Sequence, residues 1–185
     1  MSASHANRGK AFESTLDSLH AVYAQQGRAS VIRTPPNLSI LRRQPSQRKL
    51  RSGALLYDYV CQLHAEGPPD YVAQANGRSF LFDAKSCEGR RWNFSDLPPH
   101  QAARFDQHAR HGAIPFVLLR AGTVWLLPWR ELGPAWRAWE ATPGQAARGT
   151  ASVDPVLTTW CLPVRNLDWL AVAMTLPLPV PTAPR

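Results

Sequence analysis

The dipeptide Asn76-Gly77, set between two runs of strand-forming residues, constrains the fold of this 185-residue chain more than any other feature. Asn-Gly is the strongest short-range signal for a β-hairpin with a two-residue type I′ turn, because both central residues need a positive φ. The turn fixes the register, which predicts that Asp70 lies directly opposite Asp83. Since strand side chains alternate, Lys85 is expected on the same face, and the phenylalanines of the second strand on the other.

The two opposed carboxylates need a compensating feature, because like charges facing each other across a ladder are destabilising. A hard divalent cation such as Mg²⁺ would supply it, since Mg²⁺ prefers oxygen ligands and retains several waters. Lys85 would then stabilise charge that develops on a phosphate. The alternative is an ordinary hairpin whose polar face carries Asp70, Asp83 and Lys85 in solvent.

Several blocks of residues together carry a family resemblance. Pro69-Asp70 followed by Asp83-Ala84-Lys85 resembles the PD-(D/E)XK nuclease motif. More narrowly, roughly residues 7 to 132 resemble the RecU-type Holliday junction resolvases. The blocks that carry the narrower resemblance are Asn7-Arg8-Gly9-Lys10 with Glu13, Asp70-Tyr71, Phe82-Asp83-Ala84-Lys85 and His100-Gln101.

The resemblance implies an α/β fold with a restriction-endonuclease-like core, in which helices flank a mixed β-sheet and a stalk protrudes. It implies a metal-dependent endonuclease that resolves four-way junctions in recombination and repair by paired phosphodiester hydrolysis. The implied partners are branched DNA and a second copy of the chain in a homodimer, with recombination proteins as further candidates.

The resemblance also assigns the site residues. Asp70 and Asp83 would hold one or two Mg²⁺ ions, for which Mn²⁺ would substitute, and Glu13 and Gln101 would complete the shell directly or through water. Lys85 would stabilise the transition state. Two departures stand out: Pro68 replaces a common threonine, and Asp83 stands where many relatives have glutamate. The competing functions are a general PD-(D/E)XK nuclease of restriction or repair type and a non-catalytic junction-binding accessory protein.

The charge distribution favours a polyanionic partner, since 21 Lys plus Arg face 13 Asp plus Glu for a net charge of +8. Residues 28–51 hold seven basic residues and no acid. The alternative there is a solvated charged loop. The candidate DNA-binding residues are Arg8, Lys10, Arg33, Arg42, Arg43, Arg48, Lys49, Arg51, Arg90, Arg91, His100 and Arg104.

We expect a nuclease core over residues 1–140, with an insertion at 36–67, and a C-terminal extension at 141–185 that ends in a proline-rich tail. The resemblance implies that the insertion is the stalk; the competing interpretation is a disordered basic loop. Strands are predicted at 29–33, 114–119, 123–127 and, within the extension, 156–164. Because Pro115 cannot donate a ladder hydrogen bond, it should begin its strand or lie at an edge.

Two helices are predicted from apolar periodicity and end signals. The first covers about residues 7–26, is stopped by Gly27, and directs Phe12, Leu16, Leu19, Val22 and Tyr23 toward the core. On it, Glu13 either looks toward the hairpin carboxylates or is an exposed acid favoured by the helix dipole. The second begins at Pro98-Pro99 and ends near His111.

Three further expectations concern single residue types. Trp92, beside two arginines, is either a DNA contact or a core anchor. Histidines of the second helix share a face, but no Cys or acid completes a tetrahedral metal site there. The chain has no apolar run of 18 residues, no signal-peptide core and three scattered cysteines, which predicts a cytoplasmic, nucleoid-associated protein with reduced thiols.

Overall fold

The computed structural model describes residues 5–35, 38–49, 55–63, 67–142 and 152–179. It divides the chain into two units, one made of Met1–Thr34 with Pro69–Arg185 and the other of Pro35–Pro68. None of the helices in the described residues is both long and apolar enough to cross a membrane.

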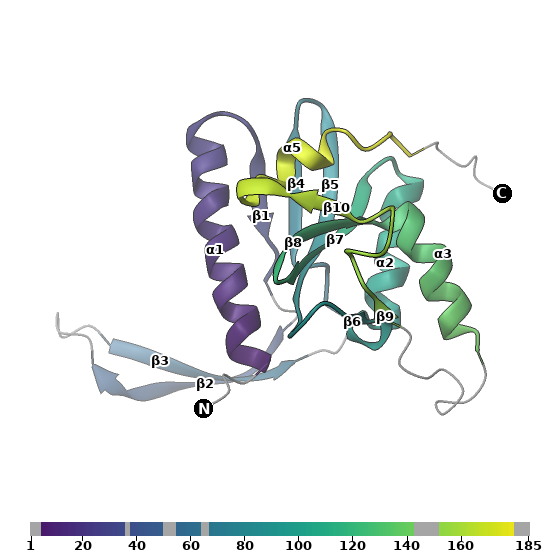
Figure 1. Cartoon of the computed structure of the whole chain (residues 1–185). Coiled ribbons are helices and arrows are strands. Elements are labelled where there is room, and N and C mark those ends of the chain that lie inside the picture. The colour runs from purple at the N-terminus through teal and green to yellow at the C-terminus, as the bar shows by residue number, and fades with distance from the viewer. Residues whose placement is uncertain (1–4, 36–37, 50–54, 64–66, 143–151, 180–185) are drawn as a thin grey trace. The chain divides into compact units, whose positions relative to one another are not determined.

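The larger unit contains helices and strands in mixed order (Figure 1). Its helices are α1 (His5–Gln25), η1 (Phe94–Asp96), α2 (Pro99–Arg110), α3 (Trp129–Glu140), η2 (Arg165–Leu167) and α5 (Trp169–Ala173). Its strands are β1 (Ser30–Arg33), β4 (Tyr71–Ala75), β5 (Arg78–Ser86), β6 (Trp92–Asn93), β7 (Ile114–Ala121), β8 (Thr123–Pro128), β9 (Ser152–Val153) and β10 (Leu162–Val164).

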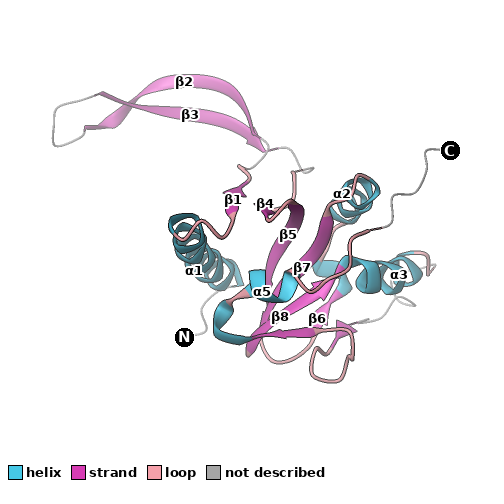
Figure 2. Ribbon diagram, turned by 90° about the horizontal axis from the view of Figure 1, so that it is seen from above, coloured by secondary structure: helices cyan, strands magenta, loops and turns pink. Residues whose placement is uncertain are grey.

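A six-stranded mixed sheet in the order β1-β4-β5-β7-β8-β10 forms the centre of this unit. Strands β5 and β7 run parallel, and the other neighbours run antiparallel. Helices α1 and α5 cover one face, while α2 and α3 cover the other (Figure 2). This arrangement confirms the predicted α/β class with a mixed sheet flanked by helices. Pro115 is the second residue of β7, near the strand's beginning as expected.

The hairpin between β4 and β5 has the predicted turn. Asn76 and Gly77 have φ values of 47° and 73°, as a type I′ turn requires. The register runs from Ala75 opposite Arg78 to Tyr71 opposite Phe82. The next pair outward is Asp70 with Asp83, so the predicted register is confirmed.

The side chains of β5 and β7 alternate between two buried layers. Phe80, Phe82 and Phe116 pack with α1 and α5, whereas Leu81 and Val117 pack with α2 and α3. The continuous apolar run of β7 is therefore buried on both faces, as a strand covered by helices on each side must be.

Helix α1 ends as predicted, but one of its apolar residues does not face the core. Gly27 has a φ of 64°, and the amide of Arg28 bonds to the carbonyl of Tyr23 at 2.9 Å. Val22 was predicted to be buried, yet it is 43% exposed. Ten residues separate it from Phe12, which at 3.6 residues per turn places it about 80° from the buried line.

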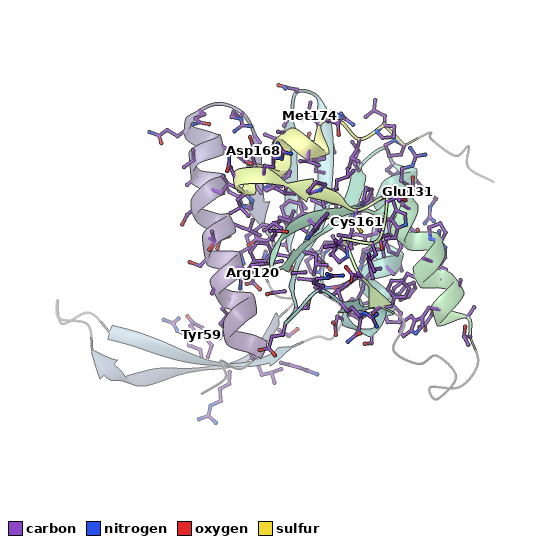
Figure 3. The ribbon with its side chains drawn as sticks, in the orientation of Figure 1. Tyr59, Arg120, Glu131, Cys161, Asp168 and Met174 are labelled. Carbon is purple, nitrogen blue, oxygen red and sulfur yellow. The ribbon has the colours of Figure 1, made fainter. Side chains whose placement is uncertain are left out.

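The C-terminal segment adds a strand and a helix to the same unit. The strand predicted at 156–164 is confined to β10, and Val156 and Leu157 are exposed. Helix α5 was not predicted, and its Trp169 is fully buried against α1 and the sheet. Asp168 and Met174, at the two ends of α5, are labelled in Figure 3.

Two polar anchors hold this segment. Asp168 accepts hydrogen bonds from Tyr23 at 2.7 Å and from Arg28 at 2.8 and 3.0 Å, and also from the amide of Ala171 at 3.3 Å, which caps α5. At the other end, the guanidinium of Arg78 donates to the carbonyls of Met174 and Leu176.

The smaller unit is an antiparallel hairpin of β2 (Leu38–Lys49) and β3 (Leu55–Leu63). The register is interrupted between Ile40 and Arg42 and between Pro45 and Lys49. The described residues of this segment are therefore paired strands and not an irregular loop. Arg42, Arg43 and Tyr59 are exposed on it.

Candidate active site

Asp70 and Asp83 lie at the open end of the β4–β5 hairpin, where the main chain of each strand holds the carboxylate of the other. The amide of Asp70 donates to Oδ1 of Asp83 at 2.9 Å. The amide of Ala84 donates to Oδ2 of Asp70, also at 2.9 Å. Each carboxylate is therefore held in place through one of its two oxygens.

Asp83 is a fully buried acid, with 0% exposure, and its Oδ2 has no hydrogen-bond partner within the described residues. Burial raises the pKa of Asp83 to about 6, the ammonium of Lys85 opposes this rise, and the carboxylate of Asp70 adds to it. A buried carboxylate oxygen without a hydrogen bond is costly, and a cation bound beside it would offset that cost.

Lys85 occupies the same face, as predicted. Its Nζ lies 3.6 Å from Oδ2 of Asp83 and donates to Oε1 of Gln101 at 3.0 Å. Gln101 lies in the first turn of α2, which begins at Pro99 after the extended residue Pro98. The structure therefore brings together the side chains of Asp83, Lys85 and Gln101, with Asp70 opposite.

The oxygen donors of this cluster suit a hard divalent cation. Mg²⁺ is typically bound by one or two carboxylates and several waters, which matches Asp70 and Asp83 with Gln101 nearby. Within the described ranges, no group of three or more His, Cys, Asp or Glu residues is arranged to hold a metal ion. The oxygen donors that are present suit a hard divalent cation that keeps several of its waters.

Glu13 is held by β1. Its carboxylate pairs with Arg33, which also contacts Asp17 at 3.0 Å. Tyr71 donates its hydroxyl to Asp17 at 3.0 Å, so helix and sheet are joined by one polar network. Arg33, predicted to bind DNA, is held in two ion pairs. The role of Glu13 at a metal stays a prediction.

This network adjoins Asp70 through the main chain. Arg33 pairs with Tyr71 in the sheet, and the next amide, that of Thr34, donates to the carbonyl of Asp70 at 2.9 Å. The hydroxyl of Thr34 donates to the carbonyl of Pro69. The sequence gives no signal for Asp17 or Thr34, because no local pattern connects Asp17 to Tyr71 or Thr34 to Asp70.

The remaining predicted DNA contacts have different surroundings. Arg90 pairs with Asp154 at 2.9 Å, while Lys10, Arg91 and Arg104 are exposed and His100 is half-buried. Trp92 is 1% exposed and packs in the core, so the core interpretation is correct and the DNA-contact interpretation is wrong. Outside the described side chains lie Arg8, Arg48, Lys49 and Arg51.

A mixed sheet that presents opposed aspartates and a following lysine at the end of a hairpin defines the PD-(D/E)XK class of nuclease folds. The chain belongs, within that class, to the RecU family: the family described as "Recombination protein U" matches residues 7–148.

Two named RecU proteins agree with this assignment. The Holliday junction resolvase RecU of Geobacillus thermodenitrificans is 27% identical over 145 residues, which are 76% of this chain and 70% of that protein. The Holliday junction resolvase RecU of Streptococcus pneumoniae (strain Hungary19A-6) is 29% identical over 131 residues, 69% of this chain and 64% of that protein. Among solved structures, Hjc of Archaeoglobus fulgidus, a Holliday junction resolvase, covers 89% of this chain and 99% of its own at 15% identity and a TM-score of 0.49.

Proposed function

We propose that this protein is a metal-dependent endonuclease that resolves four-way DNA junctions by paired phosphodiester hydrolysis. The observation that carries the proposal is the buried carboxylate of Asp83, whose Oδ2 has no hydrogen-bond partner among the described residues while Asp70 faces it and Lys85 lies 3.6 Å away. Membership of the RecU family and the named junction resolvases among its relatives support the choice of substrate.

In this proposal, Asp70 and Asp83 hold Mg²⁺, with Mn²⁺ as a substitute, and Gln101 and Glu13 complete the shell directly or through water. When bound, the ion lowers the pKa of a coordinated water and offsets charge on the phosphate. The main-chain amides of Asp70 and Ala84 keep both carboxylates in place without further rearrangement. Lys85 directs its ammonium at the phosphate and stabilises the charge of the transition state.

The four-way junction has approximate two-fold symmetry, which a homodimer with two sites would match. The β2–β3 hairpin would serve as a stalk that contacts the junction, with Arg42, Arg43, Arg48, Lys49 and Arg51 as phosphate ligands. Arg8, Lys10, Arg33, Arg90, Arg91, His100 and Arg104 complete the proposed DNA-binding set. The protein would act at the nucleoid, alone or with recombination proteins.

Cleavage of an end-labelled, immobile four-way junction beside a linear duplex of matched sequence tests the proposal, with Mg²⁺, Mn²⁺ or EDTA. The wild-type chain should make paired nicks near the junction centre only with metal. Asp83→Asn should reduce the single-turnover rate by about 10³-fold while junction binding persists, because a metal ligand is lost and the basic surface is kept. Asp96→Asn, the same change at an exposed acid, is the control.

Two outcomes would overturn the proposal. Equal cutting of junction and linear duplex would identify a general nuclease. Tight junction binding by a folded wild-type chain, with no cutting under either metal, would identify an accessory protein.

A further inference from the structure

One side of α2 continues from the site as a row of basic side chains. Gln101, which accepts the hydrogen bond of Lys85, is followed at positions 3, 7 and 10 by Arg104, His108 and His111. At 3.6 residues per turn these three project within about 80° of Gln101, all on one side of it. All three are exposed. We call this row the α2 basic edge.

No acid of the helix offsets this charge. Asp106 is the only acid among residues 99–111, and its carboxylate accepts hydrogen bonds from Nε1 of Trp129 at 2.8 Å and from Arg137 at 2.9 and 3.1 Å. Arg104 donates to a neutral partner, Oε1 of Gln107, at 3.1 Å. Asp106 is thus directed toward α3, and the positive charge of Arg104 is not offset by an acid of its own helix.

The members of the edge repel one another. Burial lowers the pKa of the His108 imidazole, and the positive charges of Arg104 and then His111 lower it further. An anion bound beside these side chains would offset the repulsion between their positive charges. Arginine can grip a phosphate through two parallel hydrogen bonds, and a neutral imidazole can donate one.

The length of α2 indicates how far along the DNA the α2 basic edge would reach. With a rise of 1.5 Å per residue, His108 and His111 lie about 10 and 15 Å along the helix from Gln101. A DNA strand advances about 3.4 Å per nucleotide along the duplex axis, so these lengths correspond to about three or four nucleotides. We propose that the α2 basic edge binds backbone phosphates of one junction arm, with Arg104 about one nucleotide and the two histidines about three or four nucleotides from the phosphodiester at Lys85.

This inference rests on the proposed function and adds His108 and His111 to the DNA surface. It also limits the DNA surface to one side of α2, so Arg110 should not contact DNA. Arg110 lies nine residues after Gln101, on the opposite side of the helix, although it is exposed and only six residues from Arg104. The two arginines therefore form a matched pair that differs mainly in direction.

Binding of a four-way junction in EDTA, measured over a range of salt concentrations, compares Arg104→Gln with Arg110→Gln. Arg104→Gln should weaken binding about tenfold and reduce the slope of log K against log salt by about 1, since one phosphate contact is lost. Arg110→Gln should change neither. Thermal melting should first show that both variants are folded. Equal effects of the two substitutions on junction binding would then overturn the inference.

A second measurement locates the contact. Junctions with one neutral methylphosphonate at successive positions should bind less tightly when the substitution lies three or four nucleotides from the cut. That interference should disappear in the double variant His108→Gln with His111→Gln. Interference that is unchanged in the double variant would overturn the inference.

The outcomes for function and surface are separable. If the wild-type chain cuts junctions with Mg²⁺ but Arg104→Gln behaves like Arg110→Gln, the surface is wrong and the function stands. If the wild-type chain never cuts, but Arg104→Gln weakens junction binding and Arg110→Gln does not, the surface stands and the nuclease is wrong.

Discussion

The two faces of the central sheet use the same strands for different purposes. On the face covered by α1 and α5, Tyr71, Phe82, Phe116 and Trp169 form one aromatic cluster, with ring centroids of neighbouring members 4.8 to 5.7 Å apart. On the face covered by α2 and α3, the same β5 presents Asp83, a buried acid with an oxygen that lacks a hydrogen-bond partner in the described residues.

Two polar contacts on the aromatic face join residues far apart in the sequence. Nε1 of Trp169 donates a hydrogen bond to Nε2 of His20 at 3.2 Å. Asp168 accepts hydrogen bonds from Tyr23 and Arg28. The comparison teaches that alternation along one strand lets a hairpin combine stability with reactivity. Phe80 and Phe82 anchor β5, and Asp83 can therefore hold a costly charge in a fixed position.

The largest expected effect on this comparison comes from Trp169→Ala. Removing a fully buried tryptophan should destabilise the fold by about 3–5 kcal/mol, because the transfer and cavity terms add. Urea unfolding measures the loss. Cleavage per folded molecule should remain near wild type, since Trp169 lies on the face away from Asp83; a parallel loss of rate in fully folded protein would show that the two faces are not independent.

The next effect is a pH dependence of stability on the aromatic face. Burial lowers the pKa of His20 from 6.5 to about 4, although Asp17 opposes the shift. Between these values the unfolded chain binds a proton that the folded chain does not, so stability should fall by about 3 kcal/mol as the pH drops from 6.5 to 4, with no contribution above that range.

Urea unfolding of wild type and His20→Gln across this pH range isolates the effect. Glutamine keeps an acceptor for Nε1 of Trp169 but does not titrate, so the difference in stability between the two proteins should shrink with acidification. A constant difference would mean that His20 is not buried as a neutral acceptor.

The smallest expected effect concerns Gln101, on the face of the sheet covered by α2 and α3. Gln101→Ala should slow single-turnover cleavage about tenfold, because the Lys85 ammonium loses its partner at 3.0 Å and a hydrogen bond to a charged group contributes about 1.5–3 kcal/mol. Stability should hardly change, in contrast to Trp169→Ala.

A double-mutant cycle sharpens that prediction. If Gln101 acts through Lys85, adding Gln101→Ala to Lys85→Ala should cause no further loss of rate. Additive losses would instead favour Gln101 as an independent ligand of the metal or water. Gln74→Ala, which removes an exposed amide bonded to Ser79 at 2.7 Å, is the control substitution.

The sequence predicted what local signals and the resemblance encode. Asn76-Gly77 determined the turn and the register, and through them the opposition of Asp70 and Asp83. Gly27 and Pro99 marked helix ends correctly. The resemblance directed attention to Gln101, but the hydrogen bond from Lys85 to it became visible only in the structure.

The sequence could not predict the long-range polar pairs. His20 and Trp169 are 149 residues apart, and Tyr23 and Asp168 are 145 apart. Neither periodicity nor spacing relates residues at such a separation. For the same reason α5, a five-residue helix whose stability comes from packing, gave no usable signal.

These separations have a consequence for the order of folding. Contacts between residues so far apart form late, because a long loop must close before they contribute. As the chain is synthesised, the aromatic rings of β5 and β7 have no cover from α5 until Trp169 has been added. Apolar surface that is exposed during this interval favours aggregation, and it is covered once α5 has packed and Tyr23 has bonded to Asp168.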